Sequence, residues 1–260
     1  MTNGRPHVQY VLDSGVRSET LLAVVETSDA TRAVVDAVDA SESAVYDALG
    51  SLERRGLVVS HDDGWQLTGR GQVVVDLLCR RNRAERLFED TDYWRTHDAS
   101  ALPRQFRKRI PELVDADTIE ATETSPHRVV ERVADRIRES ESVSIVSPIY
   151  VREYDDSMPD HENARLVVDR TLAEEAIERA ESLADVRTFS ETTVRVLDVD
   201  FALAVCEDCL LLSLPTLDGK YDSRSEILAE SERARRWGRQ LFDRCWERAQ
   251  TQEEFLAEVV

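Results

Sequence analysis

Apolar residues recur at helical spacing in three segments near the start of the chain. Residues 18–26 form the first segment and residues 31–38 the second, with Asp29 placed to cap it. A short gap leads to residues 41–55, the third segment. Its predicted inward face consists of Ala44, Val45, Ala48, Leu49 and Leu52. The pattern therefore predicts three helices, with a short turn joining the last two.

The third helix has clear end signals, and a β-hairpin is predicted to follow it. Ser41 is a suitable N-cap, and Gly56 can end the helix as a C′ glycine. Residues 57–60 alternate as a strand, the Asp-Gly pair at 63–64 favours a tight turn, and residues 65–68 return as the partner strand. A helix-turn-helix followed by such a hairpin is a winged helix.

A long helix is predicted over residues 69–89, directly after the hairpin. Its apolar side chains are expected to face inward: Val73, Val74, Leu77, Leu78, Ala84, Leu87 and Phe88. This order of elements, with the T-x-x-G motif at Thr68–Gly71, resembles the MarR/ArsR-type winged helix of archaeal and bacterial regulators.

In domains of this type the third helix enters the major groove and the hairpin tip touches the DNA backbone, so the resemblance implies a DNA contact set. We expect it to comprise Ser41, Ser43, Tyr46, Asp47, Ser51, Arg54, Arg55 and His61. Arginine can contact guanine, and hydroxyl groups can bond phosphates or base edges. Alternatively, Arg54 and Arg55 are a solvated helix end that complements the helix dipole. The hairpin tip at 61–64 has no Arg or Lys, which argues against strong phosphate contact there.

The rest of the chain alternates predicted helices and strands. Helices are expected at 126–139, with Pro126 in the first turn, and at 170–184. Strands are expected at 143–150, 164–169 and 186–190, and three short strands between 192 and 215. A terminal helix is expected from about 223 to 249, with Ile227, Leu228, Trp237, Leu241, Phe242, Cys245 and Trp246 inward. We therefore predict an α+β protein: a winged helix over residues 1–90, then an α/β effector or oligomerisation domain over residues 91–260.

Two stretches of this second region resemble a known family. YWRTHDASALPRQFRKRIPEL at 93–113 and VSIVSPIY at 143–150 are similar to the middle domain of the archaeal FilR-type (methanogenesis regulatory protein) transcription regulators. The closing stretch at 217–249 is similar to the end of the sensor domain in these regulators. The broader TrmB regulators have an effector domain that resembles a phospholipase D fold without its catalysis. The resemblance implies the same non-catalytic, phospholipase D-like fold here.

The amino-acid composition bears on the source and the location of the protein. The formal net charge is -19, from 52 acidic and 33 basic residues, and only Lys108 and Lys220 are lysines. An acidic surface rich in arginine resembles that of halophilic proteins, so we expect a haloarchaeal source; the alternative is negative charge that serves a basic partner. No apolar run approaches the ~18 residues that span a bilayer, and the start of the chain lacks a secretory pattern. We therefore expect a cytoplasmic protein.

Several residues could carry chemistry, and each has a simpler interpretation. His97, Asp98 and Ser100 lie too close in sequence to form a catalytic triad, and we expect a turn that leads into a helix with Pro103 in its first turn. Leu102, Phe106 and Ile110 should pack inward. Phospholipase-type H-x-K motifs are absent, since neither lysine follows His161 or any other histidine at that spacing. We expect no catalytic residues.

The cysteines suggest neither a metal site nor a disulfide. Cys206 and Cys209 form a single C-x-x-C, whereas a closed zinc site needs four ligands. Cys79 and Cys245 lie on apolar helix faces without matching spacing. A hairpin turn with two packed thiols is the favoured interpretation, with a redox pair or a metal site as alternatives. We therefore expect no metal and no cofactor.

A basic cluster and a set of strand ends complete the candidates. The basic cluster comprises Arg104, Arg107, Lys108 and Arg109 with Arg80, Arg81, Arg83 and Arg86, and it either supports DNA phosphates or pairs with acids across the domain interface. Strand ends that meet helix N-termini suit small anionic ligands. The expected ligand residues are Ser147, Tyr150, Asp169, Arg170, Lys220 and Tyr221, with ordinary loops as the alternative.

Together these patterns favour a transcription regulator that binds double-stranded DNA as a homodimer and senses a small metabolite, or only assembles, through its second domain. The alternatives are a protein–protein adaptor that uses a winged-helix fold and a phospholipase D-like hydrolase.

Overall fold

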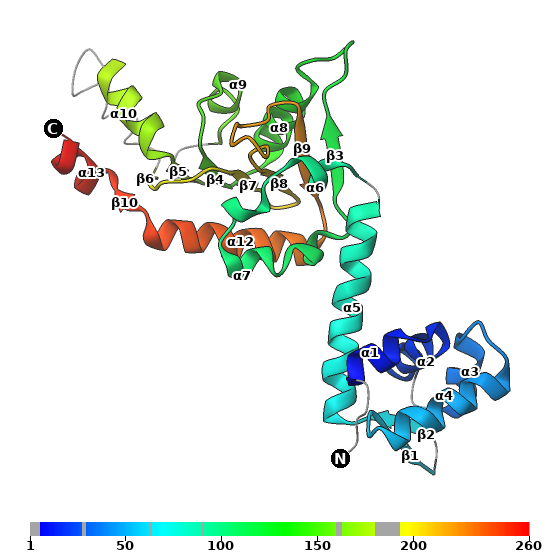
Figure 1. The fold of residues 1–260 in the computed structure, drawn as a ribbon. Helices are drawn as coiled ribbons and strands as arrows, with labels where there is room; N and C mark the ends of the chain where they lie inside the picture. The colour runs from blue at the N-terminus through cyan, green and yellow to red at the C-terminus, as the bar shows by residue number, and fades with distance from the viewer. Residues whose placement is uncertain are drawn as a thin grey trace. The chain divides into compact units, whose positions relative to one another are not determined.

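The computed structural model describes residues 6–27, 30–62, 64–89, 91–159, 163–179 and 193–259. The chain divides into two compact units, unit 1 over residues 1–83 and unit 2 over residues 84–260 (Figure 1). The division falls within the long helix α5 (Gly69–Glu89). The expected Asp29 cap, Asp63 of the hairpin turn, His161 and the strand expected at 186–190 lie outside the described residues.

Unit 1 has the predicted order of helices, hairpin and long helix. Before α5 its elements are α1 (His7–Leu12), α2 (Gly15–Glu26), α3 (Thr31–Ala37), α4 (Glu42–Arg54), β1 (Val58–His61) and β2 (Gly64–Leu67). The predicted ends of α4 are confirmed, because the Ser41 side chain accepts a hydrogen bond from the Ala44 amide and Gly56 has φ 65°. The predicted inward residues Val45, Ala48, Leu49 and Leu52 are buried against α2 and the hairpin.

The T-x-x-G motif joins the end of α4 to the start of α5. The Thr68 hydroxyl donates to the Gly56 carbonyl at 2.7 Å and accepts from the Gly71 amide at 3.1 Å. The Thr68 amide donates to the Leu57 carbonyl at 3.0 Å. Gly71 lies directly against that same carbonyl, where a Cβ atom would overlap the Leu57 oxygen. The motif therefore fixes the hairpin and α5 to the C-terminal end of α4.

Helix α5 departs from the prediction. Among its apolar residues Val74, Leu78 and Leu87 are buried, and Ala84 is half-buried. The expectation was wrong for three others: Val73, Leu77 and Phe88 are 60%, 44% and 53% exposed. The apolar residues of this helix cover more than one side, and the core of unit 1 takes only the side that contains Val74, Val75 and Leu78.

Unit 2 is built on a mixed sheet. Its strands are β3 (Asp117–Glu120), β4 (Val143–Ser147), β5 (Ala164–Val168), β6 (Thr193–Val196), β7 (Ala202–Val205), β8 (Leu210–Ser213), β9 (Ser225–Ala229) and β10 (Gln250–Thr251). Among the described residues they lie in the order β10-β6-β5-β4-β7-β8-β9-β3. The β4–β5 and β5–β6 pairs are parallel, and the others are antiparallel. The strands predicted at 143–150, at 164–169 and between 192 and 215 are confirmed, as is the α+β class.

The end of the chain differs from the predicted single helix. Residues Ser225–Ala229 form β9, which hydrogen-bonds to β8 and β3, and helix α12 (Glu232–Arg248) begins after Ser231, whose hydroxyl caps it. Ile227 and Leu228 are buried as strand residues on opposite faces of the sheet. Helix α13 (Gln252–Val259) follows. The error arose because two adjacent apolar residues in a short polar stretch fit both the 3.6-residue period of a helix and the two-residue period of a strand. Only hydrogen bonding to neighbouring strands selects the strand here.

Helices cover both faces of the sheet (Figure 1). Helix α12 and the segment 93–113 cover one face, and α8 (Arg128–Glu139) with α9 (Arg152–Asp155) covers the other. The segment 93–113 contains α6 (Tyr93–Thr96), the 3-10 turns Ala99–Ala101 and Ile110–Leu113, and α7 (Arg104–Arg107). Its apolar residues Leu102, Phe106 and Ile110 are buried as predicted, beside Trp237, Leu241, Phe242 and Cys245 of α12. Helix α10 (Arg170–Arg179) follows β5, as predicted.

Candidate nucleic-acid interface

The exposed side of α4 carries half of the predicted DNA contact set. Ser43, Tyr46, Asp47 and Arg54 are exposed, and Tyr46 presents 46% of its surface. They are exposed because Val45, Leu49 and Leu52 hold the opposite side of the helix in the core of unit 1. Hydroxyl, carboxylate and guanidinium groups on one free helix side provide both donors and acceptors for base edges.

Ser41 begins this side of the helix. Its hydroxyl caps α4 and lies 3.3 Å from the Ser43 hydroxyl. The first turn of α4 therefore presents two hydroxyl groups and free backbone amides, the arrangement that favours a phosphate at a helix N-terminus.

Ser51 and Arg55 have different surroundings. Both are half-buried, and both contact Tyr10 of α1. The Tyr10 ring lies between Arg17 and Arg55, whose guanidinium carbons are 4.1 and 3.7 Å from the ring centroid. The Ser51 hydrogen bond and these two cations lower the pKa of Tyr10. Ser51 and Arg55 thus contribute to the packing of α1 against α4; sequence analysis missed this because α1 was not predicted.

The hairpin is attached to α4 by a polar contact. Glu53 of α4 accepts hydrogen bonds from the Ser60 amide and hydroxyl, at 3.2 and 2.7 Å. His61, near the hairpin tip, is exposed and lies 3.2 Å from the amide oxygen of Gln66 on the partner strand. The imidazole remains available to solvent beside the acidic tip.

The predicted ligand residues of unit 2 act mainly within the fold. Asp169 accepts hydrogen bonds from the amides of Thr171 and Val199, at 2.9 and 3.1 Å, and its own amide donates to the Ser147 carbonyl at 2.9 Å. The Ser147 hydroxyl donates to the Ile149 carbonyl at 2.7 Å. The structure therefore brings Ser147 and Asp169 together at the ends of β4 and β5, with these polar groups already bonded; their role in ligand binding stays a prediction.

The other four predicted ligand residues are placed separately. Arg170 donates to Gln250 at 2.6 Å and lies 3.4 Å from Glu258, so it attaches the C-terminal helix to α10. Tyr150 is exposed, with its hydroxyl 3.4 Å from Asp155. Lys220 is exposed and paired with Asp218 at 2.6 Å. Among the described contacts, none joins Lys220 or Tyr221 to the remaining four.

Tyr221 lies in a polar cluster that sequence analysis did not find. The cluster consists of the half-buried Tyr154, Tyr221 and Asp222 and the buried Ser213 and Glu226, and Glu226 on β9 is only 3% exposed. Burial, with the nearby Asp222 carboxylate, raises the pKa of Glu226 to about 8. Burial also raises the pKa of Tyr154 and Tyr221. Fully buried acids are rare in folded proteins, and a buried acid with a shifted pKa marks a candidate functional site.

The histidine of the opening family stretch is buried and paired. His97 stacks on Tyr93, with ring centroids 3.7 Å apart, and its Nδ1 lies 2.8 Å from the Tyr93 carbonyl. Its Nε2 faces both Asp222, at 3.2 Å, and the Ser225 hydroxyl, at 3.4 Å. In a catalytic triad serine and aspartate bond different imidazole nitrogens, whereas here both lie at Nε2. The arrangement lacks the geometry of a triad.

Asp98 and Ser100 form the predicted turn. The Asp98 carboxylate accepts from the Ser100 amide and from its hydroxyl, each at 2.7 Å, and these two hydrogen bonds lower the pKa of Asp98. The chain then enters α7, but Pro103 is the N-cap of this four-residue helix and does not lie in its first turn as predicted.

The C-x-x-C motif is the turn between β7 and β8. The Cys206 amide donates to the Cys209 carbonyl at 2.9 Å, and both thiols are free and buried. Their mutual hydrogen bond lowers the pKa of Cys206 and raises that of Cys209. Among the described residues there is no cluster of three or more His, Cys, Asp or Glu side chains suited to a metal ion. No helix in the described ranges has the length and hydrophobicity to cross a membrane.

Comparison with known proteins identifies the larger part of unit 2. Residues 126–248 match the family described as the methanogenesis regulatory protein FilR1, middle domain. Unit 2 therefore contains a FilR1-type middle domain. The predicted FilR-type resemblance is confirmed, while the haloarchaeal source remains a prediction.

One curated FilR1-type relative and one solved structure give the extent of the likeness. The methanogenesis regulatory protein FilR1 of Methanothrix harundinacea (strain 6Ac) is 23% identical over 194 residues, which cover 69% of this chain and 43% of that protein. The chain thus spans less than half the length of this relative. The structure of TrmBL2, titled an archaeal chromatin protein with a novel mode of DNA binding, is 12% identical and covers 94% of this chain and 98% of its own, at a TM-score of 0.39.

Proposed function

We propose that the chain is a transcription regulator that binds double-stranded DNA through the exposed side of α4. The observation that carries the proposal is the polar side formed by Ser43, Tyr46, Asp47 and Arg54 on the second helix of a helix-turn-helix, with a hairpin attached directly to its end. Regulators of the FilR1 type provide independent support.

The negative net charge is compatible with this function. Repulsion between the acidic surface and the phosphates is screened over about 10 Å at 0.1 M salt and about 3 Å at 1 M salt. Contacts made at short range by α4 are therefore less affected than the long-range repulsion, and binding to base edges can still supply specificity.

We propose a homodimer that uses the exposed apolar residues of α5. Val73 and Leu77 are four residues apart, lie on one side of the helix and are 60% and 44% exposed in the single chain. Apolar side chains at this spacing are suited to packing against a second helix. A dimer would also present two copies of α4 to two half-sites of an operator.

Unit 2 is proposed to sense a small molecule on a phospholipase D-like fold that has no catalytic role. Among the predicted ligand residues, Tyr221 has the most suitable surroundings, beside the buried Glu226. If no metabolite changes the melting temperature or the DNA affinity of the full chain, unit 2 acts in assembly alone.

Genome-wide mapping of bound sites, followed by binding measurements on the recovered sequences, tests the proposed function. A regulator should yield discrete sites next to promoters and bind them at least 1,000-fold more tightly than random DNA at the same salt. Discrete protein partners with no DNA sites would favour the adaptor alternative. Hydrolysis of a phosphodiester substrate to a phosphomonoester and an alcohol would favour the hydrolase.

A further inference from the structure

Helices α7 and α12 form one continuous surface on unit 2. They lie side by side on the same face of the sheet (Figure 1), and the Trp237 indole of α12 donates to the Phe106 carbonyl of α7 at 3.2 Å. Arg109 reaches across to Gln240 at 2.7 Å. The sides turned away from the sheet meet in an open groove of about 470 Å³. We call this surface the α7–α12 face.

The α7–α12 face carries cations that lack carboxylate partners. They are Arg104, Arg107 and Lys108 from α7 and the residue after it, and Arg233, Arg236 and Arg244 from α12. All six are exposed, and none forms an ion pair within 4 Å with a described residue. The chain has 52 acidic residues and only 33 basic ones, so unpaired cations on one face are unexpected on average charge alone.

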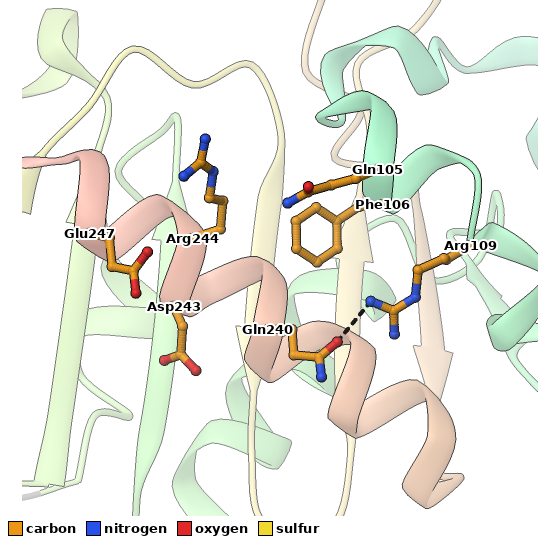
Figure 2. Close-up of a pocket in the computed structure, with 7 residues that line it drawn as sticks. All are labelled: Gln105, Phe106, Arg109, Gln240, Asp243, Arg244 and Glu247. Carbon is orange, nitrogen blue, oxygen red and sulfur yellow. Dashed lines mark hydrogen bonds between the residues drawn. The ribbon is translucent and has the colours of Figure 1, made fainter.

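Two acidic residues, Asp243 and Glu247, also line the groove, but neither forms an ion pair with the six cations. Arg244 lines the groove together with Gln105 and Phe106 (Figure 2). Asp243 lies 3.8 Å from Arg165. Glu232 lies in the first turn of α12, so with Asp243 and Glu247 the surface carries both signs of charge, with more cations than carboxylates.

Some other arginines of unit 2 are paired with carboxylates. Arg136 contacts both Asp208 and Glu230, and Arg109 forms two hydrogen bonds with Glu112, at 2.7 and 2.9 Å. The α7–α12 face leaves its positive charge available. Single arginines elsewhere on unit 2, such as Arg128, Arg132 and Arg224, do the same, but this face gathers six such cations on two neighbouring helices. Guanidinium, ammonium and side-chain amide groups are the donors that commonly bond phosphate oxygens.

We propose that the α7–α12 face binds the sugar-phosphate backbone of duplex DNA and adds sequence-independent contacts to those of α4. This inference rests on the proposed DNA-binding function. The match of charge favours DNA over a second copy of this acidic chain, because a duplex carries a phosphate charge about every 1.7 Å along its axis.

The test measures how DNA affinity of the full chain depends on salt. Each phosphate contact contributes about 0.9 to the slope of log affinity against log salt concentration. The triple variant R104Q/R107Q/K108Q should therefore lower the magnitude of that slope by about 2 to 3, on specific and random duplexes alike. The triple variant R233Q/R236Q/R244Q should lower it in the same way. Circular dichroism and melting temperature verify that both variants remain folded.

The matched control removes three charges from other exposed arginines of unit 2, in R128Q/R132Q/R224Q. Arg128 and Arg132 lie on α8, which covers the opposite face of the sheet, so this control should leave the slope within about 0.5 of the wild-type value. Equal salt slopes for all three variants and the wild type would overturn the inference. The proposed function would still stand in that case if Arg54→Ala weakened specific binding. If the full chain binds no duplex DNA, both this inference and the proposed function are wrong.

Discussion

Gly71→Ala is expected to separate the hairpin from α4 and thereby to destabilise unit 1. A Cβ atom at this position would overlap the Leu57 carbonyl oxygen and lie 3.0 Å from the carbonyl carbon and 3.3 Å from the Leu67 side chain. The clash is with backbone, so α5 or β1 must shift, and Thr68 would lose part of its bridge between Gly56 and Gly71. Forcing one extra methyl group into such a contact costs about 1–3 kcal/mol.

Gly69→Ala provides a matched control two residues earlier on the same helix. A Cβ atom at Gly69 meets nothing within 4 Å, and alanine favours the helix by up to about 1 kcal/mol over glycine. Hydrogen–deuterium exchange measured by peptide reports the opening free energy of residues 41–78 separately from unit 2. We expect faster exchange in Gly71→Ala and equal or slower exchange in Gly69→Ala. Equal protection in the two variants would refute the proposed role of the T-x-x-G motif.

Three further outcomes follow from the structure. Glu226→Gln should stabilise unit 2 by about 3 kcal/mol at pH 7 and by almost nothing at pH 4. The pKa of Glu226 in the folded protein, about 8, lies above the ordinary 4.5, so the wild type loses stability relative to the variant as pH rises through this range. Urea titrations at several pH values measure the difference in unfolding free energy, and a difference that does not change with pH would contradict the prediction. Val73→Glu with Leu77→Glu should convert a dimer to a monomer in analytical ultracentrifugation without lowering the melting temperature of the monomer, and an unchanged mass would exclude these residues from the dimer contact. Trp237→Ala should cost about 3–5 kcal/mol in unit 2, because it removes a fully buried indole and its hydrogen bond to Phe106, and a loss under 1 kcal/mol would contradict that packing.

Sequence periodicity predicted those elements whose signals are local. The ends of α4 follow from Ser41 and Gly56, and β4 and β5 follow from short apolar runs. Strand β9 was mistaken for helix because its identity depends on hydrogen bonds to β8 and β3, which have no local signal. Likewise, apolar composition alone does not decide which side of α5 is covered by the core.

The candidate sites, too, could be predicted only where their signals are local in the sequence. Helical spacing placed Ser43, Tyr46 and Arg54 on the free side of α4, but the contacts of Ser51 and Arg55 with Tyr10 depend on a helix that periodicity did not predict. The polar cluster around Glu226 joins residues from α9, β8 and β9, and His97 meets Asp222 across a sequence separation of 125 residues. Contacts of this kind are fixed by the sheet, which no single segment encodes.

The central claim is that the exposed side of α4 reads DNA, and fluorescence anisotropy with a mapped operator tests it most directly. Arg54→Ala and Tyr46→Ala should each weaken operator binding by about 1–3 kcal/mol, roughly 5- to 150-fold, and reduce the preference over random DNA. Arg32→Ala on α3, an exposed arginine 3.4 Å from Asp36, serves as the control and should change the affinity less than threefold. Unchanged operator affinity in both α4 variants at matched salt would contradict the account.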